Sequence, residues 1–140
     1  MSTELQRALA RLDEGGFTCV ITDGEQTFES HERGVAPLLA FLERGEIPVG
    51  CVAADRVVGK AAAFLYVLLR VRAVHAHVMS TPAVEVFARY GVAWSTDEQV
   101  AVIRNRAGTG FCPMETAVMN VTEAELVPDV LRAALARLKK

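Results

Sequence analysis

The sequence predicts an α/β fold, a three-layer α/β/α sandwich in which a mixed sheet lies between layers of helices. Segments with strand character alternate with segments of helical periodicity along most of the chain, an order typical of α/β folds. A tight turn at Asp23-Gly24 joins the first two strand segments as a hairpin, so part of the sheet is antiparallel. The segment 60–70, KAAAFLYVLLR, is apolar nearly all round, as expected of a helix covered on several sides.

The first half of the chain is expected to hold three helices and three strands, assigned from hydrophobic periodicity and bounding glycines. We place helices at 3–12, 34–42 and 59–70, and strands at 17–21, 26–30 and 48–53. The strand at 48–53 shows little alternation, so we expect it to be buried on both faces. Asp55-Arg56 then leads into the buried helix.

The second half is expected to continue the alternation. We place strands at 72–79, 92–95 and 100–104, and helices at 81–90, 113–120 and about 123–138. Gly91 follows the helix at 81–90 as its C-cap, since glycine readily adopts the left-handed conformation of that position. A glycine-rich turn precedes the helix at 113–120.

Length and composition favour one domain spanning residues 1–140. A chain of 140 residues buries roughly two-thirds of its unfolded surface on folding. The hydrophobic fraction of 51% and charged fraction of 23% are those of an ordinary globular protein. The net charge is −2 and the sequence has no clustered basic face of the kind that binds nucleic acid, so we expect no nucleic-acid partner.

Three features indicate a cytoplasmic protein. The longest apolar run, Ala61–Leu69, is far shorter than the ~20 residues that span a bilayer, so we expect no membrane partner. The N-terminal segment carries acidic residues and lacks the apolar core of a signal peptide. The three cysteines, Cys19, Cys51 and Cys112, are odd in number and far apart, which favours free thiols in a reducing compartment.

This order of elements resembles the cytidine-deaminase-like fold. The segment 79–87, MSTPAVEVF, followed by Tyr90-Gly91-Val92, looks like the deaminase segment that carries a Pro-Cys-x-x-Cys motif. More narrowly, the pairing of 58–63 (VGKAAA) with 108–115 (GTGFCPME) is similar to a family of uncharacterised bacterial and archaeal proteins, a domain of unknown function placed beside the deaminases by fold. The resemblance covers most of the chain, and it implies a fold but no activity.

The chain lacks the ligands that a zinc deaminase would need. Such an enzyme holds its metal with one His or Cys at the start of the buried helix and two Cys at the start of the next, with a Glu as proton shuttle. Here the first position is Val58-Gly59-Lys60, and the second keeps Pro82 but has neither cysteine. A catalytic zinc site needs about three N, S or O ligands. We therefore expect no zinc-dependent deamination, no metal site and no cofactor.

The resemblance places a candidate binding site at the starts of the two central helices. Unpaired N–H groups there suit phosphates or carboxylates. Gly59 allows close approach of a ligand, Lys60 adds a cation and Asp55 can accept from a hydroxyl or amine. Ser80-Thr81 is first of all a helix cap and can double as an anion contact. In the alternative interpretation, Asp55 lies in a surface turn, Gly59 serves packing and Lys60 snorkels from a buried helix.

The segment Thr109-Gly110-Phe111-Cys112-Pro113-Met114-Glu115 is the second candidate. Pro113 suits the first helical position, which puts Cys112 at the cap and Glu115 at the third position, where it can bond back to the cap residue. A thiol at a helix start can be nucleophilic or redox-active. No histidine is adjacent in sequence, so we favour a structural cap, with this loop, including Thr109 and Gly110, as a pocket wall.

His75 and His77 are two residues apart on a predicted strand, so both point to one face. Two imidazoles can begin a metal site. Since no third ligand lies nearby in the sequence, we interpret them as exposed or edge histidines.

Three hypotheses of function follow, and the sequence does not decide whether the protein is an enzyme. The leading one is a non-zinc, deaminase-like domain that binds a small polar or anionic ligand, such as a nucleotide, nucleoside or metabolite. The second is an enzyme that uses Cys112 as nucleophile or redox thiol, assisted by Glu115 or Lys60. The third is a structural or interaction protein, a homodimer whose interface uses exposed apolar residues between Val92 and Val102.

Overall fold

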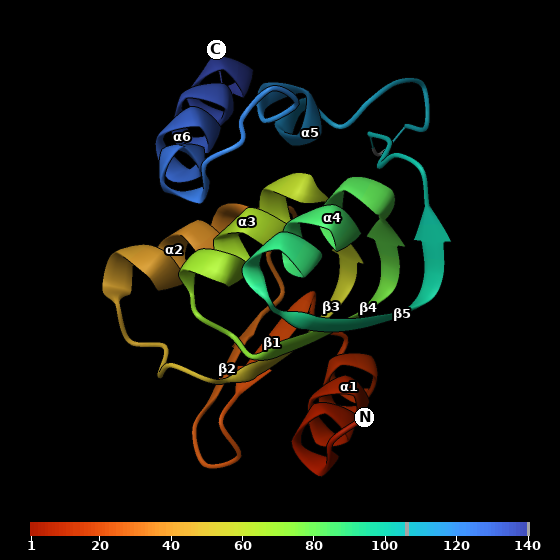
Figure 1. The fold of residues 1–140 in the computed structure, drawn as a ribbon, viewed down its shortest axis with the longest axis vertical. Helices are drawn as coiled ribbons and strands as arrows, with labels where there is room; N and C mark the ends of the chain where they lie inside the picture. Colours follow the sequence, from red (N-terminus) through yellow and green to blue (C-terminus); the bar gives the residue numbers. More distant parts are fainter. Residues whose placement is uncertain (106, 140) are drawn as a thin grey trace.

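The computed structural model describes residues 1–105 and 107–139 and is built around a five-stranded mixed sheet (Figure 1). The strands lie in the order β2-β1-β3-β4-β5. β1 pairs antiparallel with both β2 and β3, and β3, β4 and β5 are parallel. The strand bounds are β1 Cys19–Thr22, β2 Thr27–Ser30, β3 Val52–Val58, β4 Ala73–Ser80 and β5 Ala93–Val100. The predicted α/β class with a mixed sheet is confirmed.

Helices cover both faces of the sheet (Figure 1). One face carries α1, and the other carries α2, α3 and α4, with α5 and α6 lying over α3. These last two helices form a partial further layer beyond the three that the sequence predicts. The helix bounds are α1 Thr3–Gly15, α2 Ala36–Arg44, α3 Lys60–Leu68, α4 Thr81–Tyr90, α5 Pro113–Ala117 and α6 Val127–Leu138, with a 3₁₀ turn, η1, at Ala124–Leu126.

The central helix α3 is enclosed by its neighbours. Every side chain from Ala61 to Tyr66 is buried. The helix contacts β3, lies beside α2 and α4, and is covered by α5, η1 and α6. This explains why its sequence is apolar nearly all round, as predicted.

β3 begins four residues later than predicted and runs through Asp55 and Arg56. The predicted start contains Pro48 and Gly50, and Gly50 adopts a left-handed conformation with φ of 88°. The Gly50 N–H donates to the carbonyl oxygen of Arg70 instead of to a neighbouring strand. The prediction that Asp55-Arg56 leads from the strand into the helix is therefore wrong, as is the alternative of a surface turn at Asp55, because the glycine turn shifts the strand toward the C-terminus.

β5, Ala93–Val100, continues five residues beyond the end of the strand predicted at 92–95. Its residues 95–99, STDEQ, are polar, and the strand lies at the edge of the sheet, so no hydrophobic alternation marks it. Beyond it, the predicted strand at 100–104 contributes only an isolated bridge between Arg104 and Phe111. The helix predicted at 113–120 ends at Ala117, and the last predicted helix is divided into η1 and α6.

Among the described residues, no helix is both long and apolar enough to cross a bilayer.

Candidate functional site

A cavity of about 500 Å³ opens beside the N-terminal end of α3. Its walls come from β1, β3, the segment leading into α2, the first turn of α3, and α5. Most of its lining is apolar, with Val35, Leu38, Ala62 and Met114 among the contributing side chains. The titratable side chains on its walls are Cys19, His31, Arg33, Asp55, Arg56, Cys112 and Glu115.

Asp55 lies on β3 and is one of the residues that line this cavity. Its Oδ2 accepts a hydrogen bond of 2.5 Å from the hydroxyl of the fully buried Tyr66, and its Oδ1 accepts one of 3.2 Å from the backbone N–H of Val57. Burial raises the pKa of Asp55 to about 6, and these hydrogen bonds offset the effect only in part. The carboxyl group therefore changes its charge near neutral pH, a property that occurs often at functional sites.

Glu115 caps the start of α3. Its Oε1 accepts from the backbone N–H of Lys60 at 2.7 Å, and its Oε2 accepts from that of Ala61 at 2.8 Å. The prediction that Glu115 bonds back to its own helix cap is therefore wrong, because the carboxylate instead satisfies two free N–H groups of the longer helix α3.

Gly59 makes this cap possible. A Cβ atom built at Gly59 would lie 2.3 Å from Oε1 of Glu115, much closer than any real contact. The carboxylate thus occupies the position beside Gly59 where the sequence predicted an external anion. An anionic ligand at the start of α3 would have to displace Glu115.

Lys60 turns away from the cavity and does not line it. Its Nζ donates to the carbonyl oxygen of Met119 at 2.9 Å and lies 5.9 Å from the ring centroid of Phe64. Lys60 and Glu115 therefore tie α3 to α5 and the residues that follow it.

The two thiols on the cavity wall differ in environment. Cys112 is partly exposed and occupies the N-cap position of α5, as predicted, but its side chain makes no capping hydrogen bond. Cys19 is buried, and burial raises the pKa of its thiol strongly, which keeps it protonated. Of the two, Cys112 is the thiol that a solute can reach.

The structure brings together Asp55, Gly59, Cys112 and Glu115 and places the other predicted residues elsewhere. Ser80 is buried and its Oγ accepts from the N–H of Ala83, capping α4. Thr81 donates to the carbonyl oxygen of Val100. Thr109 and Gly110 form a turn in which the Thr109 N–H donates to Asn105. These four residues do not line the cavity.

His31, Arg33 and Arg56 also line the cavity, although the sequence did not predict them there. His31 stacks on Phe17 and its Nδ1 lies 3.1 Å from the carbonyl oxygen of Gly16. The Arg56 guanidinium donates to the carbonyl oxygens of Leu12 and Phe17. No local pattern marks these residues, because chain segments far apart in the sequence bring them to the cavity.

Comparison with protein families matches residues 7–135 to the family described as TM1506, domain of unknown function (DUF1893). The chain belongs to the DUF1893 family. A crystal structure of a DUF1893 family protein, TM1506 from Thermotoga maritima, is similar to this chain with a TM-score of 0.84 and 28% sequence identity. The match covers 98% of this chain and 92% of that one. A search of curated proteins found no significant match. The predicted resemblance to an uncharacterised family is confirmed.

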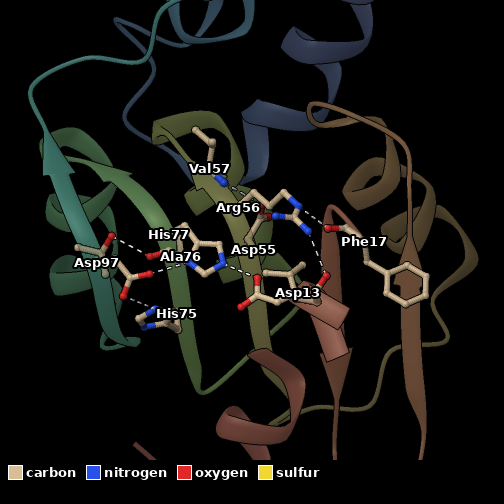
Figure 2. Close-up of polar contacts among 11 residues, drawn as sticks. Asp13, Phe17, Asp55, Arg56, Val57, His75, Ala76, His77 and Asp97 are labelled. Atoms are coloured by element: carbon tan, nitrogen blue, oxygen red, sulfur yellow. Dashed lines mark hydrogen bonds and ion pairs between the residues drawn. The ribbon is translucent and has the colours of Figure 1, made fainter. Parts of the chain in front are cut away.

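A second polar cluster of this DUF1893 protein lies on the sheet face that α1 covers in part (Figure 2). His75 and His77 on β4 lie beside Asp97 on β5, and Asp13 of α1 contacts His77 (Figure 2). His75 is only 4% exposed, so its interpretation as an exposed or edge histidine is wrong. Hydrogen bonds to Asp97 and Asp13 raise the pKa of His77, and the bond to His77 lowers that of Asp97.

Proposed function

We propose that the cavity beside α3 binds a small polar organic ligand, with Asp55 as its principal polar contact. The observation that carries this proposal is the partly buried carboxyl group of Asp55, whose pKa is raised, on the wall of a cavity of about 500 Å³. Ligand pockets in proteins commonly enclose roughly 300–1,000 Å³ and combine apolar walls with a few polar groups. The carboxylate of Asp55 favours a ligand that offers an amine or hydroxyl donor.

The rest of the lining restricts the ligand further. Apolar side chains such as Val35, Leu38 and Met114 suit a flat or apolar body, as in a nucleobase or a similar metabolite. Because Glu115 occupies the first N–H groups of α3, an anionic group on the ligand would contact His31 or Arg33 instead. A nucleoside-like molecule fits these features, and a nucleotide fits if its phosphate reaches Arg33.

We further propose that the fold is of the cytidine-deaminase-like kind. The support is the order of elements, in which a hairpin precedes β3-α3-β4-α4-β5 and α3 is buried. The starts of α3 and α4, Gly59-Lys60-Ala61 and Thr81-Pro82-Ala83, carry no thiol, imidazole or carboxylate. We therefore propose that the domain binds its small organic ligand without a zinc ion at the starts of α3 and α4.

A thermal-shift screen tests the binding proposal. Nucleosides, nucleotides, amino acids and sugar phosphates are added separately to the wild-type protein. A ligand present at about 100 times its Kd raises the free energy of unfolding by about 2.7 kcal/mol. A stabilising ligand should lose its effect with Asp55→Asn and with Ala62→Leu, which narrows the cavity. Asp129→Asn, on the exposed side of α6, is the matched control and should leave the shift unchanged. The proposal is wrong if no compound stabilises the protein or if both cavity variants respond like wild type.

An enzyme that uses Cys112 is the second candidate function. It is favoured by one observation, that this partly exposed thiol lines the same cavity as Asp55. It predicts fast alkylation of Cys112 near neutral pH, and Cys112→Ser is the control that removes the signal. An apparent thiol pKa at or above about 8.5, the value of a free cysteine, would contradict it.

A structural or interaction protein that acts as a homodimer is the third candidate function. β5 is an edge strand of the sheet, and two large apolar residues, Trp94 on the strand and Val102 just beyond it, are 39% and 41% exposed. An edge strand offers backbone groups for pairing with a second copy. Sedimentation equilibrium across a range of protein concentrations tests this candidate, and a strict monomer would argue against it.

A further inference from the structure

The two histidines of β4 form a cluster that the cavity does not involve. In the parallel pairing of β4 with β5, His75 lies opposite Ser95, and the same register brings Asp97 beside His77 (Figure 2). One ligand atom from each of His75, His77 and Asp97 lies within 4.8 Å of the others. None of the three residues lines the cavity beside α3.

The unpaired nitrogen of His75 is the decisive observation. Its Nδ1 lies 2.7 Å from the hydroxyl of Ser95, whereas its buried Nε2 has no hydrogen-bond partner among the described residues. This Nε2 lies 3.2 Å from Oδ1 of Asp97. In the tautomer that donates the Nδ1 proton to Ser95, the Nε2 lone pair faces this carboxylate, and a cation between the two atoms would stabilise the pair; in the other tautomer the Nε2 N–H points toward the carboxylate as an ion pair.

His77 is oriented in a comparable way. Its Nε2 lies 2.7 Å from Oδ1 of Asp13, and its Nδ1 lies 2.6 Å from Oδ2 of Asp97. A carboxylate that accepts the N–H of one ring nitrogen leaves the other nitrogen free to bind a metal, an arrangement common behind metal-binding histidines. Asp13 serves His77 in this role, as Ser95 serves His75.

We propose that His75 Nε2, His77 Nδ1 and the carboxylate of Asp97 bind a late first-row divalent cation, of which Zn²⁺ is the representative. Two imidazoles and one carboxylate suit Zn²⁺ or its neighbours rather than Mg²⁺ or Ca²⁺, which prefer oxygen ligands alone. Zn²⁺ at its usual bond lengths separates its ligand atoms by about 3.3 Å, so small side-chain rotations would admit it.

The proposed site has an open position. Three protein ligands leave at least one place for water or a solute, as in catalytic rather than structural zinc sites. The Asp97 and His77 side chains are 58% and 28% exposed, so that position faces solvent. An ion-pair network alone, with a charged His77 between Asp13 and Asp97, places His75 Nε2 near Asp97 but gives this buried atom no hydrogen bond among the described residues, whereas a metal ion would give it a ligand bond.

Metal titration of the untagged, metal-stripped protein tests the proposal. Calorimetry against Zn²⁺ should find one equivalent bound to the wild type. Asp97→Asn and His75→Gln should each weaken binding more than about 100-fold, and Asp13→Asn about 10- to 100-fold, because it removes only an orienting carboxylate. His31→Gln and Cys112→Ser are matched controls that should bind like wild type. Imidazole ¹⁵N spectra should show shifts of His75 and His77 on adding Zn²⁺ and none of His31.

Several results would overturn the proposal. These are the absence of saturable one-to-one binding by the wild type, unchanged affinity in Asp97→Asn, or loss of binding in Cys112→Ser, which would move the site to a thiol. Asp97 is mostly exposed, so its amide variant should fold even if His75→Gln does not, and it then decides the question alone. This test does not depend on whether the cavity beside α3 binds a ligand.

Discussion

The contact between Glu115 and Gly59 predicts strong coupling between two residues that lie far apart in the sequence. Glu115→Ala removes two charge-assisted hydrogen bonds to the start of α3, at 2.7 and 2.8 Å. Hydrogen bonds of this type contribute about 1.5–3 kcal/mol each, and solvent reaches the partly exposed carboxylate. We therefore expect a loss of about 2–4 kcal/mol in the free energy of unfolding.

Gly59→Ala should produce nearly the same loss. The new Cβ would lie 2.3 Å from Oε1, and the easiest relief is for the flexible Glu115 side chain to swing away and give up both bonds. In the Glu115→Ala background that space is empty, so Gly59→Ala should cost only about 1 kcal/mol, the difference between glycine and alanine at a helix cap.

A double-mutant cycle in urea measures this coupling. The two single variants and the double variant are each unfolded, and the coupling energy is the departure from additivity. We expect a coupling of about 1.5–3 kcal/mol. Additive losses would refute the reasoning, because they would mean that the Glu115 carboxylate does not lie against Gly59. Glu115→Gln, which keeps the shape but not the charge, should lie between wild type and Glu115→Ala.

Three further predictions concern the cavity. The pKa of Asp55 in the folded protein lies above its ordinary value of 3.8, so the protonated carboxyl group contributes fully to stability below about pH 4 and this contribution is lost as the pH rises through about 6. The free energy of unfolding in urea should therefore fall by up to about 3 kcal/mol over this pH range in the wild type but not in Asp55→Asn. Tyr66→Phe removes the bond that lowers the pKa of Asp55, so a carboxyl NMR titration should find that pKa higher still, and an unchanged value would contradict the contact. In native protein an alkylating reagent should label Cys112, whereas buried Cys19 and Cys51 should react only on unfolding, as peptide mass spectrometry can verify.

Local sequence patterns predicted most helices and strands of the fold. The apolar run at 60–70 indicated a covered helix because burial on all sides requires apolar residues on all sides, and the structure confirms it. The sequence prediction ended a strand at Ser95, five residues before the end of β5, because an edge strand exposed to solvent needs no hydrophobic alternation. The candidate site was predicted in part, since Asp55, Gly59, Cys112 and Glu115 do line one cavity.

The sequence by itself determined the elements and their order, since periodicity, turn residues and caps act between residues close in the chain. Only the tertiary structure decided what Glu115 binds, because its partner N–H groups lie 54 and 55 residues away on another helix. The same holds for Asp97 and Asp13, which reach His77 across 20 and 64 residues through the register of two parallel strands and the packing of α1. Such contacts depend on how helices and strands pack together. The spacing of two residues along the chain does not encode the distance between their side chains in the folded protein.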